Sequence, residues 1–183
     1  MCCPPSPLKR VHYFHGQLLG VEDLQAEQEY FRERLRRHNR CFHGWGVVCG
    51  LELSVTGSRV VIAPGLALDC RGNEVVLPEL LPVDLPTSAS AGVAQYVVLS
   101  HGEDFSDPAP GDQEPEGALR YSRVLESYRH ELLAEDPLGG HPRRKGRWLA
   151  CGSAHGVPLG YLRWTRGRWR LDPRYRGRQA VRE

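Results

Sequence analysis

The chain has 183 residues, of which 40% are hydrophobic, and this length is typical of a single domain that can bury a core. Its 24 basic and 22 acidic residues give a net charge of +2, which argues against nucleic-acid binding over the whole surface. No apolar run approaches the roughly 18 residues needed to span a bilayer, and the N-terminus lacks the apolar stretch of a secretory signal. We therefore expect a cytoplasmic protein.

The N-terminal part of the sequence predicts an extended arm followed by one amphipathic helix. Residues 1–10 contain three prolines, which prevent a regular element from starting there. The helix is expected from about Val21 to about Arg40, and one stripe along it repeats at alternating spacings of four and three, through Leu24, Gln28, Phe31, Leu35, His38 and Phe42. The core of this apolar stripe is Leu24, Phe31 and Leu35. We expect the stripe to be buried, so that Phe31→Ala or Leu35→Ala would lower the free energy of unfolding by about 2 to 5 kcal/mol.

The rest of the chain has the pattern of short strands, because runs rich in β-branched residues alternate with turn signals. The predicted strands are Trp45–Val55, Arg59–Ala63, Leu66–Leu68, Glu74–Leu77, Gln95–Ser100, Tyr121–Leu133, Arg147–Cys151, Val157–Trp164 and Arg168–Leu171. About nine strands and one helix predict a mainly β fold, with the N-terminal amphipathic helix packed on an antiparallel β-sandwich or barrel. We assign this single domain to residues 11–172.

Two segments have unusual charge. Residues 101–118 hold six acids, three prolines and no lysine or arginine, which predicts an exposed acidic loop. Residues 163–182 hold eight arginines interleaved with aromatic residues, which fits either a nucleic-acid surface or a final hairpin with one buried face. We favour the hairpin, followed by an arginine-rich extension at 173–183. The partner-binding arginines expected in this extension, which would contact an acidic surface on a neighbouring subunit, are Arg174, Arg176, Arg178 and Arg182.

Six cysteines in a chain without an export signal predict reduced thiols rather than a disulfide framework. A zinc site would draw on Cys41, His43, Cys49 and Cys70, but none of these shows the paired C-x2-C spacing of a zinc knuckle. A catalytic set of Cys49, His43 and Asp69 can be drawn, yet apolar neighbours indicate that Cys49 is buried, and Asp69 fits the anchor of the turn after it. We expect no enzyme activity, no metal and no cofactor.

Several segments resemble a family of bacterial proteins associated with contractile injection systems, which are phage-tail-like particles. These segments are Tyr13–Leu19 (YFHGQLL), His38–Leu51 (HNRCFHGWGVVCGL), Val61–Pro78 (VIAPGLALDCRGNEVVLP), Tyr121–Leu132 (YSRVLESYRHEL) and Val157–Trp164 (VPLGYLRW). The order of features also looks like the shoulder domain of tail baseplate and receptor-binding proteins, including the trimeric baseplate component of type VI secretion.

The resemblance implies a structural adaptor that binds other tail or baseplate proteins in the cytoplasm and is assembled into a particle that can be released. It also implies a homo-oligomer, with a trimer among the forms that such proteins take. Two alternatives from other classes stay open: a nucleic-acid-binding module that uses the arginine- and aromatic-rich C-terminus, and a small zinc-stabilised protein.

Overall fold

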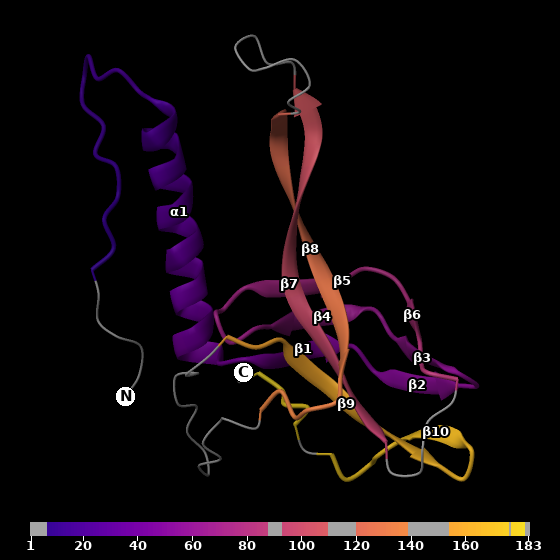
Figure 1. The fold of residues 1–183 in the computed structure, drawn as a ribbon. Helices are drawn as coiled ribbons and strands as arrows, with labels where there is room; N and C mark the ends of the chain where they lie inside the picture. The colour runs from indigo at the N-terminus through magenta and orange to yellow at the C-terminus, as the bar shows by residue number, and fades with distance from the viewer. Residues whose placement is uncertain (1–6, 88–92, 110–119, 139–153, 176, 182–183) are drawn as a thin grey trace.

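The predicted fold class is confirmed, since the chain is mainly β with one N-terminal helix (Figure 1). The computed structural model describes residues 7–87, 93–109, 120–138, 154–175 and 177–181. The helical elements are α1 (Val21–His38) and the π-helical turn η1 (Asn39–His43). The strands of the described part are β1 (Gly46–Gly50), β2 (Leu53–Thr56), β3 (Arg59–Ile62), β4 (Gly65–Leu68), β5 (Glu74–Leu77), β6 (Leu81–Asp84), β7 (Ala94–Ala109), β8 (Arg120–Leu133), β9 (Val157–Thr165) and β10 (Arg168–Leu171).

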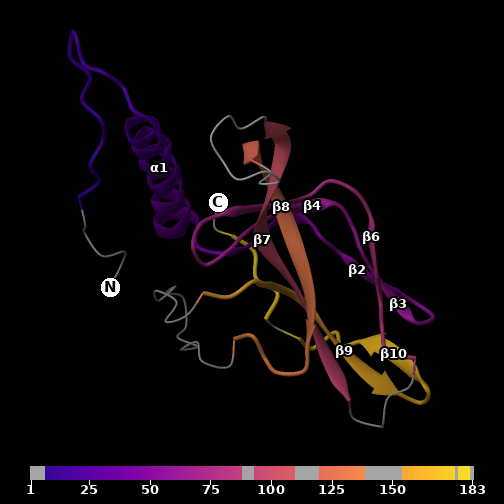
Figure 2. The same ribbon diagram turned by 45° about the horizontal axis from the view of Figure 1, so that its top comes forward.

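The strands form three antiparallel sheets around one core. The sheet orders are β1-β4-β5, β2-β3-β6 and β10-β9-β7-β8. Alternate residues enter the core, as β3 illustrates, where Val60 and Ile62 are buried and Arg59 is exposed. The core is aliphatic apart from Trp169 and draws on all three sheets. Figure 2, in which the molecule is tilted, shows β2, β3 and β6 to the right of the long β7–β8 hairpin.

Most predicted strands are found, and two keep their predicted bounds, Glu74–Leu77 and Arg168–Leu171. The predicted strand Trp45–Val55 is in fact two strands, because Gly50 and Leu51 have φ of 64° and 61°, a left-handed conformation that ends β1. Strand β6 was not predicted, and its Pro82 explains why. The predicted strand Arg147–Cys151 lies outside the described residues.

The expectation of an acidic loop over residues 101–118 is wrong for its first half. Strand β7 continues to Ala109 and pairs with β8 along its length, with Glu103 opposite Glu126 and Asp104 opposite Leu125. The guanidinium of Arg129 on β8 hydrogen-bonds to Asp104 and lowers the pKa of that carboxyl group. Residues 110–119 lie outside the described part.

Helix α1 begins where the sequence predicts, but its apolar stripe is not buried. Gly20 is the N-cap and its N–H donates to Asp23 Oδ2 at 3.2 Å, in the first helical turn. The side chains of Leu24, Phe31 and Leu35 are 50%, 59% and 52% exposed. The predicted burial of the stripe is therefore wrong, because the helix meets the strands through a neighbouring polar face that carries Arg32 and Arg36.

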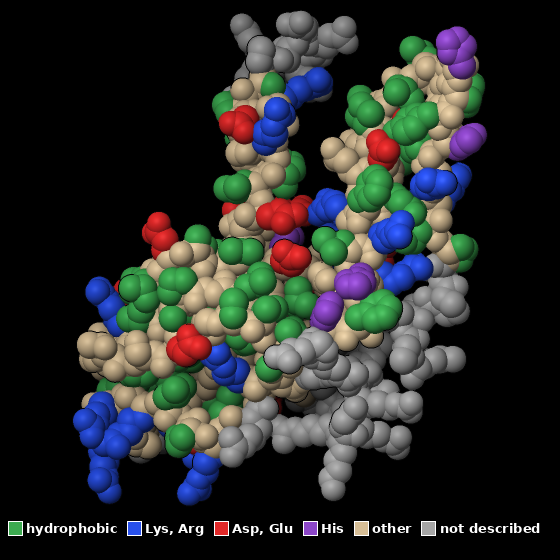
Figure 3. Space-filling view, turned by 180° about the vertical axis from the view of Figure 1, so that it is seen from behind, with side chains coloured by type: hydrophobic (Ala, Val, Ile, Leu, Met, Phe, Trp, Pro, Cys, Tyr) green, Lys and Arg blue, Asp and Glu red, His purple; other side chains and the backbone are tan. Residues whose placement is uncertain are grey.

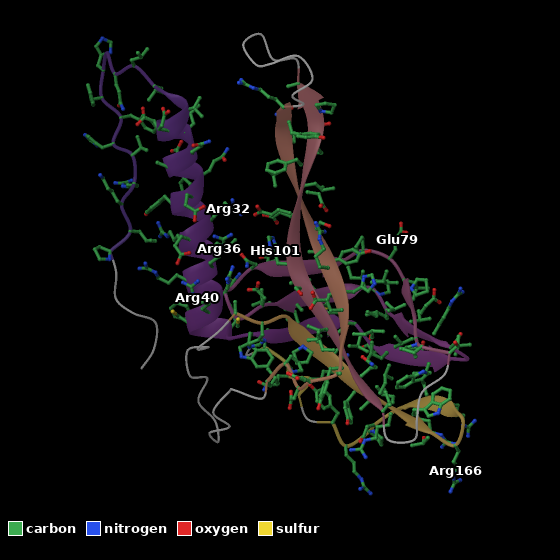
Figure 4. All side chains as sticks on the ribbon, viewed as in Figure 1. Arg32, Arg36, Arg40, Glu79, His101 and Arg166 are labelled. Atoms are coloured by element: carbon green, nitrogen blue, oxygen red, sulfur yellow. The ribbon has the colours of Figure 1, made fainter. Side chains whose placement is uncertain are left out.

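The C-terminal end of α1 is held by a polar joint, in which Arg36, Asn39 and Arg40 contact the loop Asp69–Asn73 between β4 and β5. Arg36 Nε donates to Asn73 Oδ1 at 2.6 Å, and Asn39 Nδ2 donates to the carbonyl of Gly72 at 2.9 Å. Arg40 Nη1 donates to the carbonyl of Arg71 at 2.7 Å. Figure 4 shows Arg36 and Arg40, together with Arg32, on the side of α1 that faces the strands.

The buried carboxylate of Asp69 gives the loop side of this joint its shape. Asp69 Oδ1 accepts from the N–H groups of Arg71 and Asn73, both at 2.8 Å, and Oδ2 accepts from Asn73 Nδ2 at 2.7 Å. The loop also needs glycine at Gly72, where φ is +87° and a Cβ atom would lie 2.3 Å from the carbonyl oxygen of Arg36. The predicted turn-anchoring role of Asp69 is confirmed, and this turn supports the helix.

The core and the stripe should respond differently to truncation. Leu162→Ala should lower the free energy of unfolding by about 2 to 5 kcal/mol, because Leu162 is fully buried. Phe31→Ala should change it by about 0.5 kcal/mol or less, since its ring is largely exposed. Chemical denaturation of the two variants measures both values. A loss of several kcal/mol in Phe31→Ala would show that the stripe is packed against this domain.

The polar joint makes a second prediction. Asp69→Ala should lower the free energy of unfolding by about 2 to 4 kcal/mol, because it leaves the part-buried N–H groups of Arg71 and Asn73 without their acceptor. Asp84→Ala is the matched control, since Asp84 is an exposed acid paired with Arg59, and its loss should be below about 1 kcal/mol. Hydrogen exchange should also become faster in the second half of α1 in Asp69→Ala alone. Unchanged exchange there would contradict the role given to the loop.

Candidate protein-protein interface

Helix α1 presents an apolar surface that nothing in the described part of the chain covers. Its stripe is continued by Phe42 in η1, whose ring is also exposed. The N-terminal arm runs beside the helix, and the Tyr13 hydroxyl donates to Glu27 Oε2 at 2.6 Å (Figure 1). The arm adds further exposed apolar side chains, namely Tyr13, Phe14, Leu18 and Leu19. Apolar groups gathered in this way on one projecting element are typical of protein-protein contact sites.

The β7–β8 hairpin is the second projecting element. A strand of 14 residues such as β8 is about 45 Å long, which is more than a small core can cover. No residue of β8 is buried, and Phe105 on β7 is 72% exposed. The other exposed apolar residues of the hairpin are Tyr121, Val124 and Leu125, and the rings of Phe105 and Tyr121 stack with centroids 6.0 Å apart. A two-stranded ribbon outside a core gains little stability of its own.

A cleft of about 490 Å³ lies between α1 and this hairpin. Its walls include Gln28 on the helix and Phe105 and Val124 on the hairpin. An ion pair between Arg32 and Glu103 crosses it and holds the two elements together. Figure 3 shows the helix and the hairpin from behind as two columns with a hollow between them, and hydrophobic side chains on both. The cleft therefore has a mixed lining, in which aromatic and aliphatic side chains of the hairpin alternate with charged ones such as Arg123 and Glu126.

The four residues of the zinc alternative do not form one site. Cys41 is disulfide-bonded, so the expectation of reduced thiols is wrong for this residue, and a disulfide sulfur is a poor zinc ligand. His43 Nε2 lies 3.3 Å from His38 Nε2, and Cys70 contacts the backbone of His155. Among the described residues, no group of three or more His, Cys, Asp or Glu side chains is placed to hold a metal ion.

Cys49 is also not the buried residue that its apolar neighbours suggested. A β-bulge between Val47 and Cys49, opposite Ala67 and Leu66 on β4, turns both Val48 and Cys49 outward. Cys49 is an exposed free thiol. Both carboxylate oxygens of Asp69 are bonded within the loop, so the drawn set of Cys49, His43 and Asp69 is not assembled.

A half-buried histidine lies near the polar joint, at a second cleft of about 490 Å³. His155 Nδ1 lies 2.6 Å from the carbonyl oxygen of Gly156, and its ring meets Trp45 edge-on at 4.8 Å. Burial lowers the pKa of His155, but hydrogen bonding to Cys70 and Gly156 and the nearby charge of Asp69 raise it above its ordinary value overall. The contact between Cys70 and His155 has no local signature, because the two residues are far apart along the chain.

The predicted partner-binding arginines have different environments. Arg178 Nη1 and Nη2 donate to the carbonyls of Leu51 and Gly50 at 2.6 and 2.7 Å, so this side chain binds within the chain. Arg174 is exposed after β10, whereas the side chains of Arg176 and Arg182 lie outside the described residues. The backbone of residues 179–181 pairs with Val47 at the edge of β1, with Val47 N–H donating to the Gln179 carbonyl at 2.7 Å.

Close approach explains one glycine of this region. Gly46 has φ of +139°, and a Cβ atom there would lie 2.4 Å from the carbonyl oxygen of Gln179. Only glycine can occupy this position, because any side chain would collide with the neighbouring backbone. No helix in the described ranges is long and apolar enough to cross a membrane.

No protein-family model matches the sequence. No curated protein matches it either. Among solved structures, TssK is similar with a TM-score of 0.50 and 12% sequence identity, over 91% of this chain and 41% of the TssK chain.

Two further structures are similar at lower scores. The baseplate complex from the type VI secretion system gives a TM-score of 0.48 at 17% identity, over 93% of this chain and 59% of that chain. The TssK-TssF-TssG baseplate subcomplex of that system gives 0.47 at 16% identity, over 92% of this chain and 61% of that chain. The chain thus spans less than two thirds of the length of each of these chains. The structural neighbours of this fold are type VI secretion baseplate proteins.

Proposed function

We propose that this chain is a structural adaptor in the baseplate or tail of a contractile injection system or a related phage-tail-like particle. The observation that carries the proposal is the exposed apolar stripe of α1, which stands beside an equally exposed hairpin in a fold similar to that of TssK. An amphipathic helix whose apolar face is open to water is normally completed by another protein. The occupant of this surface is another protein subunit of the particle.

The construction of the cleft supports binding rather than catalysis. Arg32 and Glu103 neutralise each other across it, and its charged lining is balanced, because Arg123 and Glu126 on the hairpin add one charge of each sign. The helix meets the β-sheets mainly through polar contacts, so a partner can contact its apolar stripe without disturbing the core. Large aromatic residues such as Phe31 and Phe105 are the type that contributes most of the energy at protein interfaces.

The proposal includes self-association, with a trimer as the expected state. Assemblies of this kind use closed symmetry, and a symmetric arrangement would let one copy contribute to the surface of the next. Light scattering and native mass spectrometry of the purified chain measure the number of copies. A monomer at all concentrations tested would contradict this part of the proposal.

The adaptor role is tested by changing the stripe and measuring assembly. In particles purified from the host, the double variant Phe31→Ser/Leu35→Ser should reduce the amount of this chain per particle at least about tenfold, as loss of a central aromatic contact does. Quantitative mass spectrometry of the particles measures this amount. Thermal unfolding should be nearly unchanged, because both residues are exposed in the isolated chain.

Val76→Ser provides the matched control. Val76 on β5 is 53% exposed, close to the values of the two stripe residues, but it belongs to the β-sheets and not to the cleft. This variant should enter particles at the wild-type level. Equal occupancy of the double variant, or absence of the wild-type chain from particles, would contradict the adaptor role.

A further inference from the structure

The hairpin of β9 and β10 carries a surface that the apolar cleft does not use. On its outward face Arg170 lies directly opposite Arg163, and Arg168 lies opposite Thr165. Arg166 sits in the connecting turn with φ of 53°. All four arginines are exposed, and together they form an arginine face. Figure 4 places Arg166 at the tip of the hairpin, and Figure 3 shows basic side chains gathered at the same corner of the molecule.

The charge of this face is not balanced within the described part of the chain. Arg163 is paired, with its Nε 3.1 Å from Asp172 Oδ2, but no ion pair involves Arg166, Arg168 or Arg170 among the described residues. Like charges directly opposite each other on neighbouring strands destabilise a sheet. Arg163 and Arg170 occupy such a pair of positions. The face therefore has a stability penalty that an acidic ligand would remove.

We propose that the arginine face binds an extended acidic segment of a partner protein. Arg168 and Arg170 are two residues apart on one strand, so their side chains emerge about 6.5 to 7 Å apart. An extended segment with acidic residues at alternate positions repeats at the same distance. Guanidinium groups pair with carboxylates through two parallel hydrogen bonds, which suits arginine better than lysine. The ion pair with Asp172 holds the side chain of Arg163 in place at one end of the face.

The aromatic residues of the hairpin favour a protein partner over a nucleic acid. Trp169 is buried and its indole N–H donates to the carbonyl of Pro86 at 2.9 Å, while Trp164 packs edge-on against it at 5.4 Å. Tyr161 is on the arginine face, but its ring lies 5.2 Å from the Arg163 guanidinium and 4.6 Å from the ring of Tyr96. These rings are engaged within the fold and are not free to stack on bases, as single-stranded nucleic-acid sites require.

The arginine face is separate from the adaptor cleft. The cleft is proposed to bind apolar side chains of a partner, whereas the arginine face is proposed to bind acidic ones. The cleft lies between α1 and the β7–β8 hairpin, whereas the arginine face lies on β9 and β10. Failure of one proposal leaves the other intact. Binding to the face should weaken with added salt, since exposed charges are screened.

The experiment measures the dissociation constant of a short fluorescent peptide of alternating glutamate and serine by anisotropy. Arg168→Gln/Arg170→Gln should raise this constant at least about tenfold. Arg34→Gln/Arg123→Gln is the matched control, since it removes the same charge from exposed arginines on α1 and β8 and should leave binding nearly unchanged. The first double variant should also unfold at the same or a higher temperature, because it relieves repulsion between like charges.

Two results would overturn the proposal. The first is an equal loss of peptide binding in the two double variants, or no binding of the peptide at all, which would reduce the face to ordinary exposed charge. The second is tighter binding of an oligothymidylate of similar length than of the peptide, dependent on Arg168 and Arg170, which would make the face a nucleic-acid site.

Discussion

The arrangement of this protein depends on the polar joint between the end of α1 and the Asp69–Asn73 loop. One buried carboxylate orders the loop, the loop presents an amide and two carbonyls, and three side chains from the helix region bind them. Hydrogen bonds of this kind fix direction, whereas apolar packing fixes proximity and leaves direction less constrained. The helix is therefore held at one end and by its polar side.

The exposed stripe is a consequence of that attachment. If α1 had been packed through Leu24, Phe31 and Leu35, those side chains would have joined the core and the helix would have had no binding surface. Because the joint uses Arg36, Asn39 and Arg40 instead, the apolar face remains exposed. The domain thus separates two tasks: the aliphatic core between the sheets stabilises the fold, and the helix and hairpin remain available to a partner.

The arginines of the C-terminal part divide in a similar way. Arg178 has become part of the fold by binding two carbonyls at the end of β1, and residues 179–181 line the same strand. On the β9–β10 hairpin the tryptophans face inward and the arginines face outward, which is the pattern of a hairpin with one buried face. Arg178 has its hydrogen-bond acceptors within the chain, whereas most arginines of the arginine face have no acidic partner among the described residues. This difference can be seen only in the folded structure.

The sequence by itself determined the elements that local rules control. The start of α1 follows from Gly20 and the acids after it, β5 and β10 follow from alternation bounded by turn residues, and the anchoring role of Asp69 follows from its place before Arg71-Gly72-Asn73. The mainly β class could be predicted for the same reason. Periodicity reports which residues share a face, and that information is local.

Only the tertiary structure decided which shared faces are buried. The stripe of α1 has the spacing of a helix packed on a core, yet it is exposed. A helix that packs on a partner protein has the same periodicity as one that packs on its own core, so the sequence pattern does not distinguish them. The outward turn of Cys49 depends on a bulge whose cause is the register with β4, and the extent of β7 depends on its pairing with β8 across residues that resemble a loop in composition. Contacts between distant residues, such as Arg36 with Asn73, have no local signature, so the joint that orients the helix was visible only in the folded chain.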